Sequence, residues 1–248
     1  MTEQSSAADL ASGACVSARK RRLRYLWQGA LAVALLVLTA SWSLGDRPYE
    51  AERRVFSVLN GLPDQFDVVL IPVMQAGALA AVFAAGVLAL IARRPGLAGL
   101  LVLAGGSAWV LAKLVKRVVE RGRPAEYFDD VVIHGAVQMG QGFPSGHAAV
   151  IAAMATVASP YLSRTGRILV WTVVGLVALA RVYTGAHLPL DVVSGVAVGW
   201  GLGCVINLVL GTPARACCPP SRLDCPTLQS RRERPGAAVL RVPRCAER

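Results

Sequence analysis

The chain has 248 residues, of which 54% are hydrophobic, and its mean hydropathy is +0.51. A soluble domain of this size needs more polar surface, so this composition argues against an ordinary soluble protein. A formal net charge of +11 would suggest a nucleic-acid partner in a soluble protein, but the placement of the charges along this chain argues against one.

Six apolar runs approach or exceed the roughly 20 helical residues that cross a lipid bilayer. They cover residues 26–44, 68–92, 97–119, 147–162, 167–183 and 190–210. The fourth and fifth runs are short, so we expect their helices to continue into the neighbouring polar segments. The predicted fold class is all-α, a bundle of six transmembrane helices.

Basic residues gather in the four regions that six spans would place on one side of the membrane. They precede the first span, fill the 2–3 and 4–5 connections, and follow the sixth span: Arg19, Lys20, Arg21, Arg22, Arg24, Arg93, Arg94, Arg164, Arg167, Arg215, Arg222, Arg231, Arg232, Arg234, Arg241, Arg244 and Arg248. This positive-inside pattern predicts cytoplasmic termini in a plasma or inner membrane. The outer side then receives residues 45–67, residues 120–146 and the short turn between the last two spans.

The chain divides into three parts. Residues 1–24 form a basic cytoplasmic tail, residues 25–211 form the membrane domain, and residues 212–248 form an Arg-, Cys- and Pro-rich tail that we expect to be disordered. The first apolar run begins late and is long for a signal peptide, which favours an uncleaved anchor. No cysteine falls in a predicted outer loop, so no disulfide is expected; the six are Cys15, Cys204, Cys217, Cys218, Cys225 and Cys245.

Two of the predicted outer segments are expected to be more than simple connections between spans. Residues 51–60 can form an amphipathic helix at the membrane interface, with an apolar side made by Val55, Phe56, Val58 and Leu59. Residues 120–146 form a long loop, and such loops in compact domains are usually functional or disordered. His134, within this loop, is expected to be solvated.

A first polar cluster, Pro144-Ser145-Gly146-His147, stands at the start of the fourth apolar run. Proline and serine are favoured at helix starts, and glycine allows a ligand to approach the backbone. Because a helix N-terminus attracts anions, His147 would point at a bound anion. The alternative is a capped helix start with an incidental histidine.

A second cluster contains Arg181, His187 and Asp191, close to the start of the sixth run. His187 and Asp191 are four residues apart, so they would share one face of a helix. A carboxylate there accepts the Nδ1–H of the imidazole and leaves Nε2 free as a nucleophile. The alternative is a His–Asp pair at a membrane boundary, although such pairs are costly in spans.

A third cluster, Lys116 and Arg123-Pro124, follows the third run. Both cations lie on one side of a helix, two turns apart, so both could reach one tetrahedral anion. The alternative is that Lys113, Lys116, Arg117 and Arg121 simply extend to the membrane interface. These cations lie on the side that the positive-inside pattern should deplete, which calls for another reason.

In this order, the three clusters resemble the signature of the type 2 phosphatidic acid phosphatase family, K-x6-RP, PSGH and SR-x5-H-x3-D. The vanadium haloperoxidases are soluble relatives of that family. The resemblance covers residues 25–211 and implies a six-helix layout with the active site at the outer end. One position departs from the signature, because Ala180 stands where the family has serine. We therefore expect weaker or altered phosphate binding.

The resemblance implies a catalytic role for three residues. His187 attacks phosphorus and forms a phosphohistidine, Asp191 holds His187, and His147 protonates the leaving oxygen and later activates water. It also implies that the transferred phosphoryl group is neutralised by Lys116, Arg123, Arg181 and the segment Ser145-Gly146. No metal or other cofactor is implied, because the cations supply the positive charge.

The implied substrate is a membrane lipid phosphate, either a monoester or a diphosphate. Candidates are undecaprenyl pyrophosphate, phosphatidic acid and phosphatidylglycerol phosphate, and we favour the polyprenyl diphosphate. Two other functions remain open: a lipid-phosphate binding or transport protein without turnover, and a vanadate-dependent haloperoxidase-like enzyme.

Overall fold

The computed structural model describes residues 3–45 and 47–210, with side chains from residue 19 onward. In this part of the chain the regular elements are helices and there is no strand, as predicted. The α-helices are α1 (Glu3–Ser43), α2 (Glu50–Asn60), α3 (Asp67–Met74), α4 (Leu79–Ile91), α5 (Pro95–Val119), α6 (Pro124–Tyr127), α7 (Gly146–Ala158), α8 (Arg164–Tyr183) and α9 (Pro189–Val209). Three short 3-10 turns join them: η1 (Asp64–Phe66), η2 (Gln75–Gly77) and η3 (Ser159–Tyr161). The predicted tail 212–248 lies outside the described residues.

Four of the described segments are long and apolar enough to cross a membrane: Arg19–Ser43, Pro95–Tyr127, Arg164–Tyr183 and Pro189–Val209. A fifth span is possible if the pair Asp64–Gly77 and Leu79–Ile91, bent by 73°, counts as one. The structure therefore gives four or five candidate spans, whereas six were predicted from the sequence. The segment that accounts for the difference is the predicted fourth span, 147–162.

Helix α7 has only 13 residues, so it is about 20 Å long, well short of the ~30 Å hydrocarbon layer. The ten residues from Ala148 to Val157 are all buried. A short helix that is apolar on every side is typical of a protein core rather than of a lipid-facing span. The apolar run was read correctly as a helix, but it is surrounded by protein.

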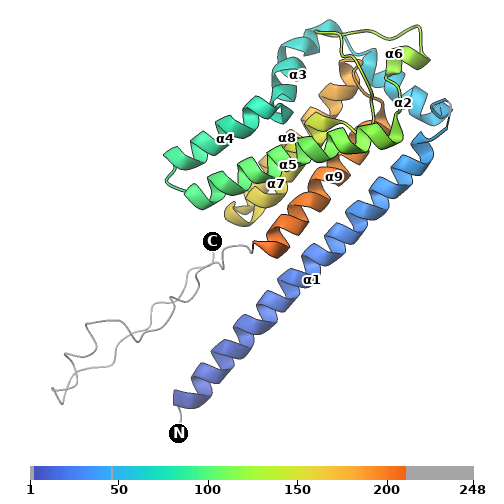
Figure 1. The fold of residues 1–248 in the computed structure, drawn as a ribbon. Helices are drawn as coiled ribbons and strands as arrows, with labels where there is room; N and C mark the ends of the chain where they lie inside the picture. Colours follow the sequence, from blue (N-terminus) through green and yellow to red (C-terminus); the bar gives the residue numbers. More distant parts are fainter. Residues whose placement is uncertain (1–2, 46, 211–248) are drawn as a thin grey trace. The chain divides into compact units, whose positions relative to one another are not determined.

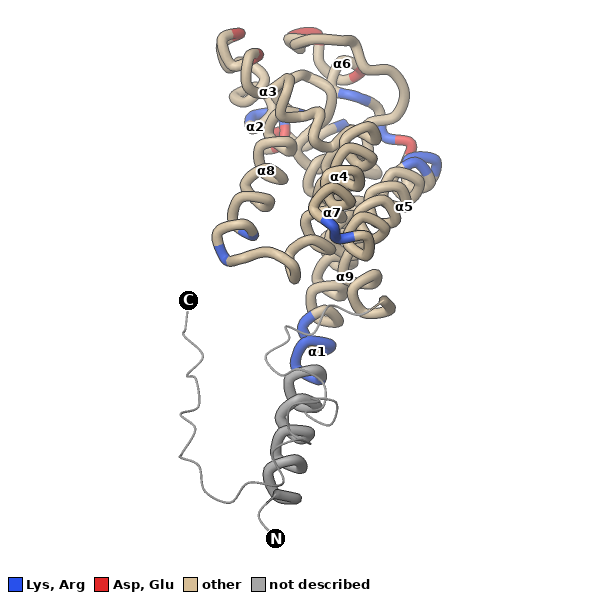
Figure 2. The backbone as a smooth tube through the Cα atoms, turned by 90° about the vertical axis from the view of Figure 1, so that its left-hand side faces the viewer, with Lys and Arg blue, Asp and Glu red and all other residues tan. Residues whose placement is uncertain are grey.

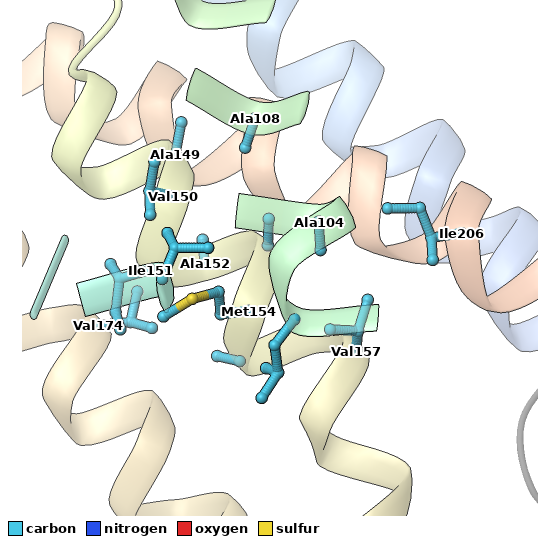
Figure 3. Close-up of a cluster of buried hydrophobic side chains, with 14 of the residues drawn as sticks. Ala104, Ala108, Ala149, Val150, Ile151, Ala152, Met154, Val157, Val174 and Ile206 are labelled. Carbon is cyan, nitrogen blue, oxygen red and sulfur yellow. The ribbon is translucent and has the colours of Figure 1, made fainter. Parts of the chain in front are cut away.

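The neighbours of α7 come close because they carry small residues. Gly195, Gly199 and Gly203 of α9 face α7 at a spacing of four, and a methyl group at any of them would collide with α7 atoms or with the residue before it. Figure 3 shows the apolar cluster that results, in which alanine and valine side chains of α5 and α7 interdigitate with Val174 and Ile206. This core fixes the start of α7 relative to α5, α8 and α9.

The predicted second span is broken into α3 and α4. Pro72 lies inside α3, and Ala78 has an extended backbone (φ −74°, ψ 155°), which ends the helical path after η2. Gly77 at the break lies against α7, because a Cβ there would be 2.5 Å from the carbonyl oxygen of His147. The break thus brings a backbone segment directly onto the start of α7.

Helix α2 occupies the residues where an amphipathic helix was predicted. Its buried residues are Glu52, Phe56 and Asn60, whereas Val55 and Val58 are exposed. The predicted apolar side is therefore only partly correct: the side that faces the protein includes a carboxylate.

One end of the bundle collects the short elements. In Figure 1, α2, α3 and α6 lie together at the end where α5 and α8 finish and where α7 and α9 begin. Figure 2 shows the coloured acidic residues at this same end, together with basic residues near α2, α6 and the end of α5; further basic residues colour α1 and the beginning of α8. The candidate chemistry lies at the end with α2, α3 and α6.

Candidate active site

The eight predicted site residues come from separate parts of the chain and meet at this end of the bundle. They are Lys116 in the last turn of α5, Arg123 just before α6, Ser145, Gly146 and His147 at the start of α7, Arg181 in the last turn of α8, His187 between α8 and α9, and Asp191 in the first turn of α9. Antiparallel helices that alternate in direction bring these ends together. Each predicted motif therefore contributes to one cluster.

His187 lies at the centre of this cluster and is only 2% exposed. Burial, together with the charges of Arg181, Lys116, Arg123 and His147, holds the pKa of His187 well below its ordinary range. A low pKa keeps the imidazole neutral near neutral pH, which is the form with a free lone pair. The same surrounding cations favour a bound oxyanion.

The prediction that His187 and Asp191 share one helix face is wrong, because α9 begins at Pro189 and His187 precedes it. The two side chains still face each other, with His187 Nδ1 3.7 Å from Asp191 Oδ2. This separation is longer than a hydrogen bond. The backbone N–H of His187 donates to the carbonyl of Arg181 (3.1 Å), which places the ring beside the end of α8.

Two of the predicted phosphate-binding cations also hold the 120–146 loop in place. Lys116 Nζ donates to the carbonyls of Gln141 (2.6 Å) and Gly142 (2.9 Å). Arg123 donates to the carbonyls of Gly140 and Ala186, each at 2.7 Å. Both side chains retain further N–H groups, since an ammonium has three and a guanidinium five. These contacts tie the end of the loop to the last turn of α5 and, through Arg123, to the turn between α8 and α9.

Three buried polar atoms in the cluster have no hydrogen-bond partner: Ser145 Oγ, Arg181 Nε and His187 Nδ1. In the described part of the chain only two other buried side-chain atoms share this condition, Ser43 Oγ and Asn207 Oδ1. Unpaired buried polar groups are costly and call for an explanation. Their gathering around His187 fits a site that is completed by a polar ligand.

The start of α7 differs in one respect from the expected anion site. The backbone N–H of Ser145 donates to the carbonyl of Asp191 (2.8 Å), so it is already used. Its hydroxyl does not cap the helix, although serine is a favoured cap. Ser145 therefore offers its side chain to a ligand instead of its amide.

Ala180, where the resemblance leads one to expect serine, is fully buried and packs with Leu70, Met74 and Tyr183. Met74 also touches the site, since Arg181 Nη1 lies 3.7 Å from its sulfur. The expected weakening of phosphate binding at this position stays a prediction.

Two residues that the sequence did not single out as site residues join the cluster. Arg121, expected to extend to the interface, is buried and binds both Asp191 and Glu52. No spacing rule connects Glu52 with the three motifs. The only sequence signal is a carboxylate in the first turn of an otherwise amphipathic helix.

His134 was expected to be solvated, and this is wrong. It is buried, its ring stacks on Tyr183 with centroids 4.0 Å apart, and its Nδ1 lies 3.1 Å from Asp67 Oδ1. Asn60 completes this contact by accepting the N–H of Val132 (2.9 Å). These contacts fix the loop 120–146 to α2, α3 and α8. Nowhere in residues 3–45 and 47–210 do three His, Cys, Asp or Glu side chains group as a metal site would require.

The segment that holds the predicted site residues is similar to known proteins. The sequence profile of the PAP2 superfamily matches residues 96–214, a segment that holds all eight predicted site residues but not Glu52. Over 118 residues the chain is 36% identical to decaprenylphosphoryl-5-phosphoribose phosphatase from two Mycobacterium tuberculosis strains, CDC 1551 and H37Rv. The match covers 46% of this chain and 63% of each relative, which is less than two thirds of the relatives' length.

Two solved structures share the fold. LpxE of Aquifex aeolicus gives a TM-score of 0.60 at 25% identity, over 64% of this chain and 96% of that one. The first transmembrane PAP2-type phosphatidylglycerolphosphate phosphatase from Bacillus subtilis also gives 0.60, at 20% identity, over 73% of this chain and 94% of that one. Both matches cover nearly the whole of the other protein, so the helical domain is shared as a unit.

Proposed function

We propose that the chain is a member of the PAP2 superfamily, whose profile matches residues 96–214, and that it is a metal-independent phosphatase of membrane lipid phosphates. The chain is a multi-pass membrane protein, which suits a lipid substrate. The observation that carries the proposal is the cluster at one end of the bundle: a buried imidazole, surrounding cations and unpaired buried polar atoms.

The proposed reaction has two steps. Nε2 of His187 attacks phosphorus, the bond from phosphorus to the lipid oxygen breaks, and His147 gives that oxygen a proton. His147 then takes a proton from water, which attacks the phosphohistidine and releases inorganic phosphate and free His187. Asp191 stabilises the positive charge that the His187 ring acquires on phosphorylation. Such acid–base assistance contributes about 10²- to 10⁴-fold in rate.

The cations and the start of α7 take the second role in this proposal. Lys116, Arg123 and Arg181, with Ser145 and Gly146, neutralise the equatorial oxygens in the transition state. One preorganised donor of this kind is worth about 3 kcal/mol in known oxyanion sites. Because these cations supply the charge stabilisation that a metal ion gives in other phosphatases, the proposed reaction needs no metal.

The lipid is proposed to be a polyprenyl phosphate. Support comes from the Mycobacterium relatives, whose name specifies a decaprenyl-linked phosphoribose. Undecaprenyl pyrophosphate, phosphatidic acid and phosphatidylglycerol phosphate are the other candidates. The proposed orientation places the site on the outer side of the membrane and the termini in the cytoplasm, supported by the basic residues away from the site end.

The test is phosphate release by the purified full-length chain in detergent, from the three candidate lipids and a polyprenylphosphoryl phosphoribose. We expect turnover that orthovanadate inhibits and EDTA leaves unchanged, and no turnover by His187→Ala at an unchanged unfolding temperature. Retained turnover in His187→Ala would rule out His187 as the nucleophile, and loss of activity with EDTA would indicate a metal mechanism. Lipid binding without turnover would favour the binding protein, and bromide oxidation with bound vanadate would favour the haloperoxidase.

A further inference from the structure

Arg121 is a fully buried cation that lies between two carboxylates from different elements. Its Nη1 donates to Asp191 Oδ1 (2.8 Å) and to Glu52 Oε1 (3.1 Å), and its Nη2 donates to Glu52 Oε2 (2.6 Å). The side chains of all three residues are at most 4% exposed. We call these three residues the carboxylate relay.

Glu52 is held in this position from a second side. Its Oε1 also accepts the backbone N–H of Leu190 (3.0 Å), the residue just before Asp191. Helix α2 therefore contacts the start of α9 through the same carboxylate that binds Arg121. Isolated charges are very costly to bury, so this arrangement needs every one of these bonds.

Each oxygen of Asp191 has a defined partner. Oδ1 accepts one hydrogen bond from Arg121. Oδ2 accepts the backbone N–H of Leu188 (2.9 Å) and lies 3.7 Å from His187 Nδ1. The fork of Arg121 binds Glu52, so it meets Asp191 through one nitrogen only. Without Glu52, a fork-to-fork pair between Arg121 and Asp191 would neutralise the catalytic carboxylate more fully.

The charges of the relay also have a consequence. Within the relay, two carboxylates and one guanidinium leave one negative charge in excess, which partly offsets the positive charges of Lys116, Arg123 and Arg181 around His187. In the proposed reaction the His187 ring becomes positive when Nε2 bonds to phosphorus, so this excess charge favours the transition state over the ground state. The stabilisation is strongest where water is excluded, as it is around these buried side chains.

We propose that Glu52 and Arg121 are positioning residues: Arg121 favours the ionised form of Asp191, and Glu52 holds Arg121 in place so that Asp191 stays turned toward His187. The inference rests on the proposed phosphatase function and extends the catalytic machinery to α2, which lies before the segment 96–214 that the superfamily profile matches. The competing explanation is that Glu52 and Arg121 only anchor α2 to the bundle.

The test compares two glutamates of one helix. Glu52→Gln keeps the size and the acceptor oxygen of the side chain but removes the charge. Glu50→Gln, the matched control, removes the charge of an exposed carboxylate that pairs with Arg54 (3.1 Å) on the outer surface of α2. If Glu52 is a positioning residue, Glu52→Gln should lower kcat by about ten- to a hundredfold and leave KM within about twofold. This range is typical of residues that orient the ligands of a metal site. Glu50→Gln should match the wild type in both.

Arg121 is tested by rescue. Arg121→Met leaves the buried Glu52 without a charged partner, so the double variant Glu52→Gln/Arg121→Met serves where the single variant fails to fold. We expect the double variant to lose no more kcat than the larger single effect, because residues that act as a unit are not additive. Arg121→Lys, which restores a point charge, should recover part of kcat.

The outcomes separate the two explanations. A wild-type kcat in folded Glu52→Gln, with only a lower unfolding temperature, means that α2 is merely anchored and overturns the inference alone. A loss seen only in KM also overturns it. If the wild-type chain releases no phosphate from any lipid of the panel, the proposed function fails first and the inference fails with it.

Discussion

At the scale of single residues, the hydroxyl of Ser145 is not used to stabilise its helix, although serine at this position usually is. Serine at the residue before a helix ordinarily caps it, and replacing such a cap with alanine costs about 1 kcal/mol. Ser145 does not use its hydroxyl in this way: the hydroxyl is buried and unpaired. Ser163, at the same position before α8, does cap its helix by accepting the N–H of Gly166 (3.1 Å).

Replacing Ser145 or Ser163 with alanine should therefore have opposite effects on stability and on inhibition by orthovanadate. Ser145→Ala should leave the free energy of unfolding unchanged or raise it by up to about 1 kcal/mol, because an unsatisfied buried group is removed. It should weaken inhibition by orthovanadate about fivefold, the equivalent of one hydrogen bond of about 1 kcal/mol. Ser163→Ala should lower stability by about 1 kcal/mol with no change in inhibition. Thermal unfolding in detergent and inhibition curves measure both, and unchanged inhibition in Ser145→Ala would exclude its hydroxyl from the site.

At the scale of elements, the break between α3 and α4 matters because it lets η2 touch the start of α7. An unbroken helix over 67–91 would keep its backbone a side chain's length away from α7. The kink comes from Pro72 and the extended residue Ala78, and Gly77 makes the close contact with His147. Through this contact the second apolar run helps to position the proposed acid–base residue.

We predict that Gly77→Ala lowers stability by about 1–3 kcal/mol, because a methyl group there meets the backbone of His147 and one of the two must move. Activity should fall as well, mainly in kcat, since His147 moves with its backbone. The matched control is Gly106→Ala in α5, where a Cβ has no neighbour within 4 Å. That change should raise stability by about 0.5–1 kcal/mol and leave kcat unchanged. Equal behaviour of the two variants would contradict the close contact.

At the scale of the whole molecule, the charges divide the bundle into two ends. The site end carries both acidic and basic residues, whereas the opposite end of the bundle, from residue 19 onward, carries only basic ones, in α1, in the α4–α5 connection and at the start of α8. A membrane with a negative inner surface and a positive-inside bias favours one orientation of such a molecule. The site would then face the outer side.

Thiol labelling of intact cells checks this orientation. In a chain whose native cysteines are replaced by serine, Met139→Cys lies in the outer loop at a residue that is 89% exposed. Thr165→Cys, also at an exposed position, lies in the first turn of α8 at the opposite end of the bundle. A reagent that does not cross membranes should label position 139 in intact cells and position 165 only after lysis. The reverse pattern would place the site in the cytoplasm.

The all-helical class, the three motifs, the approximate limits of α5, α8 and α9, and the C-terminal end of α1 could all be predicted from the sequence, whereas α1 begins at Glu3, well before the predicted residue 26. Long apolar runs and fixed spacings are local properties, so they can be read along the chain. Local reading also explains one error and one unconfirmed prediction: His134 has no neighbour in sequence that foretells its burial, and a run of small apolar residues gives the same signal for the buried α7 as for a span.

Only the tertiary structure decided which residues support Asp191. Arg121 lies 69 residues from Glu52 and 70 from Asp191 in the chain, and no periodicity connects residues so far apart. Their pairing depends on where α2 packs against the start of α9, which is settled by the burial of Phe56, Leu188 and Val192 in one cluster. Once those elements are in place, the cost of burying an unpaired charge selects the partners.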